Sequence, residues 1–131
     1  MAKTLFDHAT VEGWNEEAGG FHYTVDWDGR PHLSNRLWWP CAEGIGAAAF
    51  LNAIDSAPRY EEWYRRIWDF VARELIDYER GGWRTEAVDP TGRTAPLFEG
   101  KPDLYHALQA CLIPLLPTSG TVTRGLASGE L

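Results

Sequence analysis

The segment Cys41–Ile54 limits the possible folds of this chain more than any other feature. Its residues are nearly all small or apolar, and its glycines and alanines would let neighbouring helices approach closely. Pro40 stands near the first position of a helix and Glu43 in its first turn, which is typical of a helix start. Because a helix that is apolar all round is buried all round, we expect residues 40–54 to form an inner helix.

The segment that follows has one polar and one apolar face. Its apolar residues recur at helical spacing, and its charged residues take the opposite side. We therefore predict an amphipathic outer helix over residues 59–79, terminated by Gly81 and Gly82. A buried helix next to an amphipathic one is what a two-layer helical fold requires. The positions predicted to be buried are Ile45, Ala48 and Phe50, and those predicted to be exposed are Glu62, Arg66 and Arg73.

Part of the sequence occurs twice. The stretch Gly20–Arg30 is echoed by Gly82–Arg93, and the glycine pairs 19–20 and 81–82 are 62 residues apart. Each copy contains glycines, an aromatic residue, a short strand and a turn. We expect residues 21–30 and 82–93 to form superimposable short hairpins at one end of the helices. A period of this length indicates stacked units, each with one helix pair and one hairpin.

The two ends of the chain complete the expected organisation of about four helices. Residues 3–13 and 102–115 have the composition of a first and a last helix. Residues 118–131 are rich in glycine, serine and threonine, and we expect them to form a flexible tail. Residues 1–117 are then one structural unit, which is all-α apart from its hairpins.

Charge and cysteine content narrow the functional classes. The formal charge is −7, from 12 basic and 19 acidic residues, which argues against nucleic acid or an anionic membrane as a partner. No apolar run approaches the roughly 18 residues of a membrane span, and no signal peptide is recognisable. Cys41 and Cys111 are not part of a CxxC motif, so we expect two buried free thiols in a reducing compartment, the cytoplasm.

The stretch Phe98–Gln109 carries the most evident chemistry. Gly100 permits unusual backbone angles and Pro102 suits the first helical position, so we predict a loop that leads into a helix. His106 then lies about one turn into the helix, on the same face as Asp103. A neutral imidazole beside a carboxylate is suited to carry protons at neutral pH. The alternative is a structural histidine packed against its neighbours.

Two motifs resemble a known family. The segments Arg36–Gly44, RLWWPCAEG, and Gly100–Ala107, GKPDLYHA, are similar to the C-terminal motifs of the N-acylglucosamine 2-epimerase superfamily. The mannose and sulfoquinovose isomerases are the most similar branch, followed by the cellobiose 2-epimerases. The resemblance covers roughly residues 1–117, with both motifs in the family's order and each before a predicted helix.

The resemblance implies a fold and a chemistry. The fold would be part of an (α/α)6 barrel with short β-hairpins between helices. The reaction would be isomerisation of an aldose to a ketose, or epimerisation at C2, through an enediolate and without a metal or other cofactor. Two histidines on different helices exchange the protons in this family, and His106 matches the last of them.

The same resemblance implies a binding site for a monosaccharide. Trp38, Trp39 and Glu43 fall where the family lines its sugar pocket. An aromatic face stacks on the apolar face of a pyranose, and a carboxylate accepts hydrogen bonds from hydroxyl groups. The simpler interpretations are core tryptophans and an acid that complements the helix dipole. Asp103 joins this set, either orienting His106 or serving only as an acid at the helix start.

The chain also departs from the family. It supplies about four of the twelve helices of such a barrel, and the upstream His-x-x-Glu motif that carries the other catalytic histidine has no counterpart. We therefore expect a C-terminal fragment of an isomerase that has little activity alone. Its open sides should lead to self-association, or to binding of the missing N-terminal part of the barrel.

The sequence is also compatible with two other functional classes. One is a non-catalytic remnant of the same fold that binds carbohydrate or serves in assembly. The other is part of an (α/α)-barrel glycoside hydrolase, which would need two carboxylates across the scissile bond. Glu43 and Glu99 are the only attractive pair for that reaction, and the motif around His106 argues against it.

Overall fold

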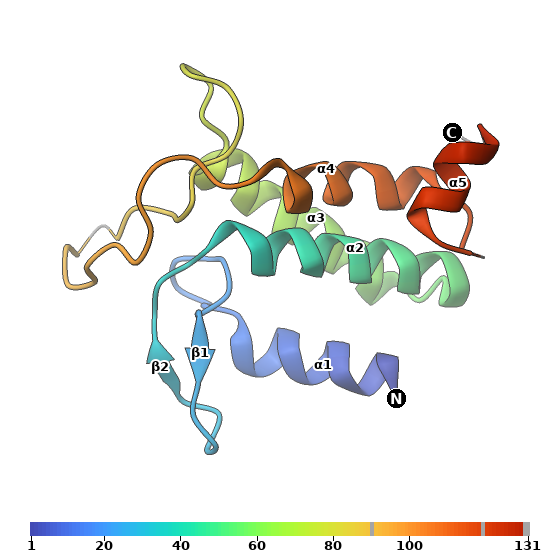
Figure 1. Cartoon of the computed structure of the whole chain (residues 1–131). Coiled ribbons are helices and arrows are strands. Elements are labelled where there is room, and N and C mark those ends of the chain that lie inside the picture. Colours follow the sequence, from blue (N-terminus) through green and yellow to red (C-terminus); the bar gives the residue numbers. More distant parts are fainter. Residues whose placement is uncertain (90, 119, 130–131) are drawn as a thin grey trace.

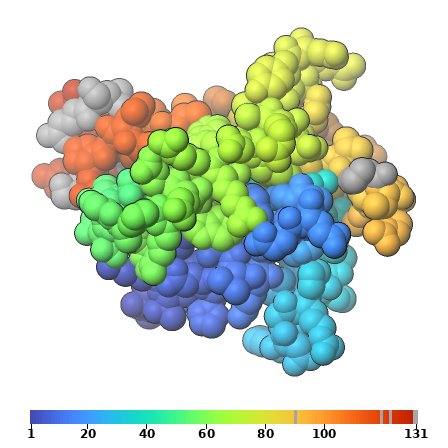
Figure 2. Space-filling view, turned by 180° about the vertical axis from the view of Figure 1, so that it is seen from behind, coloured from blue at the N-terminus to red at the C-terminus, as the bar shows by residue number. Residues whose placement is uncertain are grey.

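The computed structural model describes residues 1–89, 91–118 and 120–129, and it is mostly helical. Helices α2 and α4 lie side by side and run in the same direction, with α3 behind them and α1 beside α2 (Figure 1). Seen from the opposite side, the visible face is formed mainly by α3, with α1 below it (Figure 2). The helices are α1 (Ala2–Gly13), α2 (Trp38–Asp55), α3 (Pro58–Phe70), α4 (Leu104–Leu112) and α5 (Val122–Ser128).

Short elements extend or connect these helices. A π-helical turn, Val71–Leu75, continues α3, and a 3-10 turn, Ile113–Leu115, continues α4. Strands β1 (Thr24–Val25) and β2 (Pro31–Leu33) form an antiparallel pair between α1 and α2. The long connections therefore gather at the end of the helices where α2 and α4 begin (Figure 1). No helix among the described residues is long and apolar enough to cross a membrane.

Helix α2 forms the centre of the main hydrophobic core, as its small apolar residues predicted. Ile45 and Ala48 are fully buried, together with Ile67 and Phe70 of α3. A Cβ atom added to Gly44 would lie 3.0 Å from Ile67 of α3, and close packing therefore depends on the absence of a side chain there. The predicted inner and outer roles of residues 40–54 and 59–79 are confirmed, with Glu62, Arg66 and Arg73 exposed.

The burial of α2 is incomplete, and one prediction fails as a result. The side chain of Phe50 is 43% exposed, although we predicted that it would be buried. Ala47 and Ile54 are exposed on the same side of α2. The physical reason is that α1, α3 and α4 cover only part of the circumference of α2, so its remaining side faces solvent in this chain.

Several predicted boundaries and environments need correction. The outer helix ends at Leu75 and not near residue 79, because Ile76 adopts an extended conformation. The last helix begins at Leu104 and not at residue 102, because Asp103 is its N-cap. Cys41 is buried as expected, and burial raises the pKa of its thiol to about 12, but Cys111 is exposed. Residues 118–131, predicted to be a flexible tail, include helix α5, capped by the Thr121 side chain and ended by left-handed Gly129.

The sequence echo corresponds to a repeated turn at the ends of α1 and α3. The backbone bonds of the first turn recur in the second at the same 62-residue offset, and both turns contain two glycines with positive φ. In the first turn they are Asn15 N to Gly20 O (2.8 Å) and His22 N to Gly13 O (2.8 Å). In the second they are Asp77 N to Gly82 O (2.9 Å) and Arg84 N to Leu75 O (2.7 Å).

The two copies diverge beyond this turn. The first continues into the predicted hairpin, with Thr24 paired to Leu33. The second forms no hairpin within the described part of residues 82–93, so that prediction is wrong. Its backbone groups bond instead to the segment before α2, through Trp38 N to Thr85 O (3.1 Å) and Ala87 N to Arg36 O (2.9 Å). A strand whose polar groups are already paired in this way does not need to fold back on itself.

The repeated turn yields a matched pair of mutations. Gly20 and Gly82 have φ angles of 78° and 71°, so alanine is strained at either position, at a cost of about 1–2 kcal/mol. A Cβ atom at Gly20 would also lie 2.5 Å from the ring of Phe70, whereas nothing lies within 4 Å at Gly82. We expect Gly20→Ala to lower the free energy of unfolding by about 1–3 kcal/mol more than Gly82→Ala, measured by urea denaturation. Equal losses would contradict the close packing of Phe70 on this turn.

Candidate functional site

The candidate site lies where the first turns of α2 and α4 come together. His106 lies in the first turn of α4, and Glu43 lies in the second turn of α2. A 3.0 Å contact joins His106 Nδ1 to Glu43 Oε1. Gln109 Nε2 donates to the same carboxylate oxygen at 3.4 Å. The structure thus brings together two of the residues that the sequence predicted, from positions far apart in the chain.

The contact with Glu43 determines which ring nitrogen of His106 is available for chemistry. A carboxylate can only accept hydrogen bonds, so Nδ1 carries the proton of the neutral imidazole. Nε2 is then the nitrogen with a free lone pair, which is the one that can act as a base. The side chains of His106 and Glu43 are 25% and 47% exposed, so both remain accessible to a small molecule.

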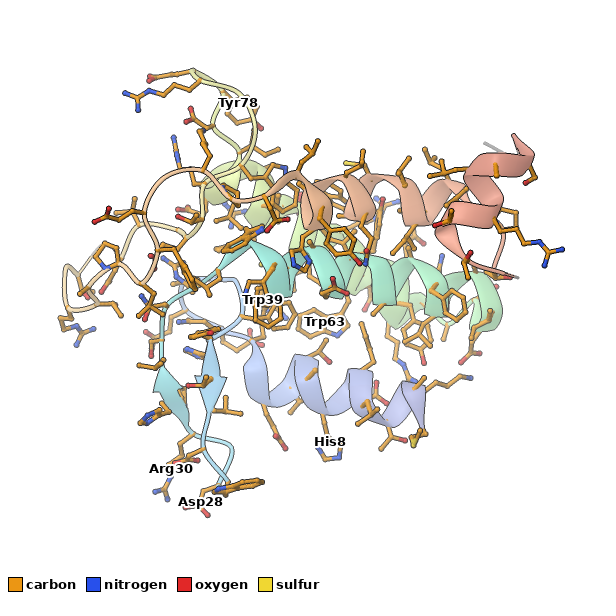
Figure 3. All side chains as sticks on the ribbon, viewed as in Figure 1. His8, Asp28, Arg30, Trp39, Trp63 and Tyr78 are labelled. Carbon is orange, nitrogen blue, oxygen red and sulfur yellow. The ribbon has the colours of Figure 1, made fainter. Side chains whose placement is uncertain are left out.

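Aromatic rings surround the histidine. The rings of Trp38 and Trp39 each lie 6.2 Å from that of His106, at interplanar angles of 77° and 39°. Tyr105 lies 5.0 Å from the same ring. Figure 3 shows Trp39 at the beginning of α2. Together these rings form a partly apolar wall around an imidazole.

Trp38 has a feature that distinguishes it from an ordinary core tryptophan. Its side chain is buried, yet its indole Nε1 has no hydrogen-bond partner among the described residues. Buried indole N–H groups usually find a partner. The indole ring lies 5.8 Å from the ring of Phe98, measured between ring centres, and its unpaired N–H is suited to a water molecule.

Asp103 takes a different role from the one expected for an orienting acid. Its carboxylate accepts a 3.4 Å bond from the backbone N of His106, which is the geometry of an N-cap. The imidazole ring itself is held by Glu43. Asp103 therefore fixes the start of α4, and its exposed carboxylate also lies beside the candidate site.

A carboxylate that the sequence did not single out holds the loop before α4. Glu86 accepts a bond from Asn35 Nδ2 (2.9 Å) with one oxygen, and from the backbone N of Leu97 (2.7 Å) and Phe98 (3.3 Å) with the other. These bonds place Phe98 against Trp38. No local sequence signal distinguishes Glu86, because its partners are distant in the chain.

Arg36 ties the two copies together. Its buried guanidinium donates to the carbonyl oxygens of Ala18 (2.9 Å) and Gly19 (3.3 Å) in the first turn, and to Val88 O (2.8 Å) in the second copy. It also lies 5.5 Å from the ring centre of Phe70. This residue lies two positions before Trp38 and fixes the connection that leads into α2.

Lys101 ties the loop before α4 to the turn of the second copy. Its ammonium group donates to Asp77 Oδ2 at 2.5 Å and to Gly81 O at 2.9 Å. The bond from Lys101, followed by that from the backbone of Arg80, lowers the pKa of the Asp77 carboxyl to about 2. The sequence motif around His106 contains Lys101, but nothing in the sequence identified Asp77 as its partner.

A large groove at the loop end does not coincide with this site. It has a volume of about 900 Å³ and is lined by residues of the loop end such as Asn35, Arg36 and Asp89, and by none of the predicted site residues. Arg36 and Asp89 use their polar atoms in bonds within the chain. The candidate site is instead an open surface formed by α2 and α4. Among residues 1–89, 91–118 and 120–129, no three His, Cys, Asp or Glu side chains are grouped to hold a metal.

Comparison with known proteins relates the chain to sugar isomerases. Residues 1–110 match the family model N-acylglucosamine 2-epimerase (GlcNAc 2-epimerase). A D-mannose isomerase of Pseudomonas cannabina pv. alisalensis is 39% identical over 127 residues, which cover 96% of this chain and 31% of the relative. A D-mannose isomerase of Thermobifida fusca is 41% identical over 130 residues, which cover 97% of this chain and 32% of the relative. The chain thus spans about a third of the length of these curated relatives.

A solved structure shows the same relationship. A crystal structure of D-mannose isomerase superimposes with a TM-score of 0.77 at 28% identity, covering 86% of this chain and 29% of that chain. The predicted fold class, a partial (α/α)6 barrel of about four helices, is confirmed by this similarity and by the helical content.

The pairing of Glu43 with His106 can be tested by the tautomer of the ring. In Glu43→Gln the amide can donate as well as accept, so the preference for a proton on Nδ1 should be lost. We expect ¹⁵N NMR at pH about 9, above the ordinary imidazole range, to show mainly the Nδ1–H form in the unmodified chain and a mixture in the variant. Glu99→Gln removes the same charge from the nearby loop and should leave the Nδ1–H form dominant. A ring that is insensitive to Glu43→Gln would contradict the pairing.

Proposed function

The chain belongs to the N-acylglucosamine 2-epimerase family, and from this premise we propose that it forms part of a sugar isomerase of the mannose–fructose type. The observation that supports this function best is the bond between His106 and Glu43 beneath two tryptophans. The substrate proposed is a monosaccharide. An inactive remnant that only binds carbohydrate is the alternative outcome of the experiment below.

In the proposed reaction, His106 carries a proton. A base removes a proton from the carbon next to the sugar carbonyl, the electron pair moves into the carbon–carbon bond, and an enediolate forms. Return of the proton to the former carbonyl carbon C1, with transfer of the hydroxyl proton from the oxygen on C2 to the oxygen on C1, gives the ketose. His106 Nε2 serves as this base or as its acid partner, because Nδ1 donates to Glu43.

The substrate would lie against the aromatic wall. Trp39, which is half-buried, presents its ring to the apolar face of a sugar ring, and the buried ring of Trp38 supports this wall from behind. Glu43 and Asp103 provide carboxylate oxygens at the margins of this surface. These assignments deepen the substrate-binding roles that the sequence motif implied.

The reaction needs a second acid or base besides His106. The other three histidines of this chain have different surroundings. His8 bonds to Glu12 on α1, on the side turned away from α2 (Figure 3). His22 is half-buried, and burial followed by the nearby charge of Arg36 lowers its pKa. His32 lines the groove at the loop end. Loss of a positioned acid or base typically reduces the rate by about 10²–10⁴, so we propose that these 131 residues alone have little activity.

We further propose a cytoplasmic location, because both cysteines are free thiols and Cys111 is exposed. An exposed thiol is more compatible with a reducing compartment than with an oxidising one. This proposal can be checked independently of activity, by the localisation of a tagged chain.

The proposed function is tested in a chimera. This chain replaces the corresponding third of the Thermobifida fusca D-mannose isomerase, with which it is 41% identical. In deuterated water the chimera should exchange the C2 proton of mannose, followed by NMR, and His106→Ala should reduce the exchange by at least about 10²-fold. His32→Ala serves as the matched control and should not change the rate. A folded chimera that binds mannose without exchange would favour the carbohydrate-binding alternative, and full activity of His106→Ala would remove His106 from the mechanism.

The exposed sides of α2 and α4 lead to a separate proposal about assembly. Large apolar side chains are exposed there, and contiguous apolar patches beyond a few hundred Å² are rare on monomers. These residues are Phe50, Ile54, Leu104, Leu108 and Leu115. We propose that this surface is covered by further helices of a barrel or, in the isolated chain, by a second copy.

We expect the isolated chain to self-associate at micromolar concentration, measured by light scattering. The double change Phe50→Glu and Leu108→Glu should shift the mass towards the monomer, because both side chains would place charges in the contact. Val11→Glu on α1 changes an even more exposed apolar residue outside this surface and should have no effect. A stable monomer of the unmodified chain would contradict the proposal.

A further inference from the structure

Asp77 uses its two side-chain oxygens for two separate tasks. Oδ1 accepts bonds from the backbone N of Glu79 (3.2 Å) and Arg80 (3.0 Å), which closes the turn after α3. Oδ2 accepts the 2.5 Å bond from Lys101 Nζ. The carboxylate is only 11% exposed, so this ion pair is shielded from solvent on the side of Asp77.

The repeated turn shows which task requires a charge. The equivalent of Asp77 in the first copy is Asn15, 62 residues earlier. Asn15 Oδ1 accepts from the backbone N of Glu17 (3.1 Å) and Ala18 (2.9 Å), the same two bonds in the same turn. A neutral amide is therefore sufficient to close the turn. What the carboxylate adds is a second acceptor with a negative charge, and that oxygen binds Lys101.

Lys101 is placed to control the start of α4. It lies just before the N-cap Asp103, and its second bond goes to Gly81 O. The first turn of α4 has little packing of its own, since Leu104 and Tyr105 are 74% and 65% exposed. The first fully buried side chain of the helix is that of Ala110, one turn beyond His106.

From this geometry we infer that Lys101 and Asp77 are positioning residues, which hold the first turn of α4 so that the His106 ring meets Glu43. The bonds to Lys101 fix the chain before the N-cap, and the N-cap bond then fixes the backbone of His106. The tie itself follows from the contacts alone. That the positioned ring performs acid–base chemistry rests on the proposed function.

The test distinguishes the role of Asp77 in closing the turn after α3 from its role in binding Lys101. Asp77→Asn should keep the turn, as Asn15 does in the first copy, but weaken the bond to Lys101. In ¹⁵N NMR spectra, the backbone signals of Glu79 and Arg80 should stay in place, while the His106 ring should lose its preference for the Nδ1–H form. Lys101→Met should give the same change at His106, and Lys101→Arg should restore it. Lys3→Met removes a similar ion pair with Asp55, remote from this site, and should leave His106 unchanged.

The outcomes decide between positioning and a purely structural role. An unchanged His106 ring in both Asp77→Asn and Lys101→Met would overturn the inference. So would loss of the turn, or unfolding, in Asp77→Asn, because the carboxylate would then be needed for the turn itself. Spectra that follow the expected pattern would support it, whether or not the chain proves to be active.

Two further measurements separate this inference from the proposed function. In the chimera, Lys101→Met should lower kcat more than it raises KM, with activity regained in Lys101→Arg. If no chimera exchanges the mannose proton, the proposed function fails while the spectra still decide the inference. Because its folded pKa is depressed, Asp77 stays ionised on acidification, so the tie should persist below pH 3.8 and be lost only as pH falls through about 2.

Discussion

The arrangement of the site depends on one buried cation. Arg36 lies beneath the loop end, and within the described residues it donates to three backbone carbonyls from both copies of the repeat and to no carboxylate. A buried charge is costly unless it is hydrogen-bonded, so these carbonyls must be held in place for the fold to be stable. The glycine turn after α1 supplies two of them, and its left-handed residues pack on Phe70. The direction in which α2 begins, and with it the placement of both tryptophans, follows from this constraint.

The parts that could be predicted from the sequence are those that depend on local pattern. The small residues of α2 and the amphipathic spacing of α3 identified both helices. Close packing between helices requires small residues and a solvent-exposed face requires polar ones, so both features can be recognised from residue types. The 62-residue echo identified the repeated turn, because only glycine adopts its backbone angles freely. The hairpin of the second copy was predicted from the same echo and does not form within the described part of residues 82–93, because similar residues there pair with the segment before α2. Local similarity cannot show which distant strand offers the better partner.

The residues of the candidate site could be proposed from the sequence, but their geometry could not. Motif resemblance placed Trp38, Trp39, Glu43 and His106 in one pocket, and the structure brings them into contact. The sequence suggested Asp103 as a partner of His106 because helical neighbours are easy to identify, whereas the ring bonds across helices to Glu43. The surrounding loops are held by Glu86, Asp77 and Lys101. Their bonds connect residues that are far apart in the sequence, and such bonds produce no periodic sequence pattern. The exposure of Phe50 was missed for a related reason, since burial of an inner helix depends on which neighbours are present.

The repeat also explains why the candidate site lies between α2 and α4. Each copy delivers an inner helix whose first turn starts at the same end, so side chains from two copies meet there without any long excursion of the chain. The copies share the turn but not its chemistry: a neutral Asn15 is sufficient before the helix that bears the tryptophans, and a charged Asp77 precedes the helix that bears the histidine. Two tryptophans at the start of α2 are anchored by their own bulk, since large rings packed on neighbours have few alternative positions. A single imidazole on a sparsely packed helix start has no such anchor, and a charged tie before the helix supplies one.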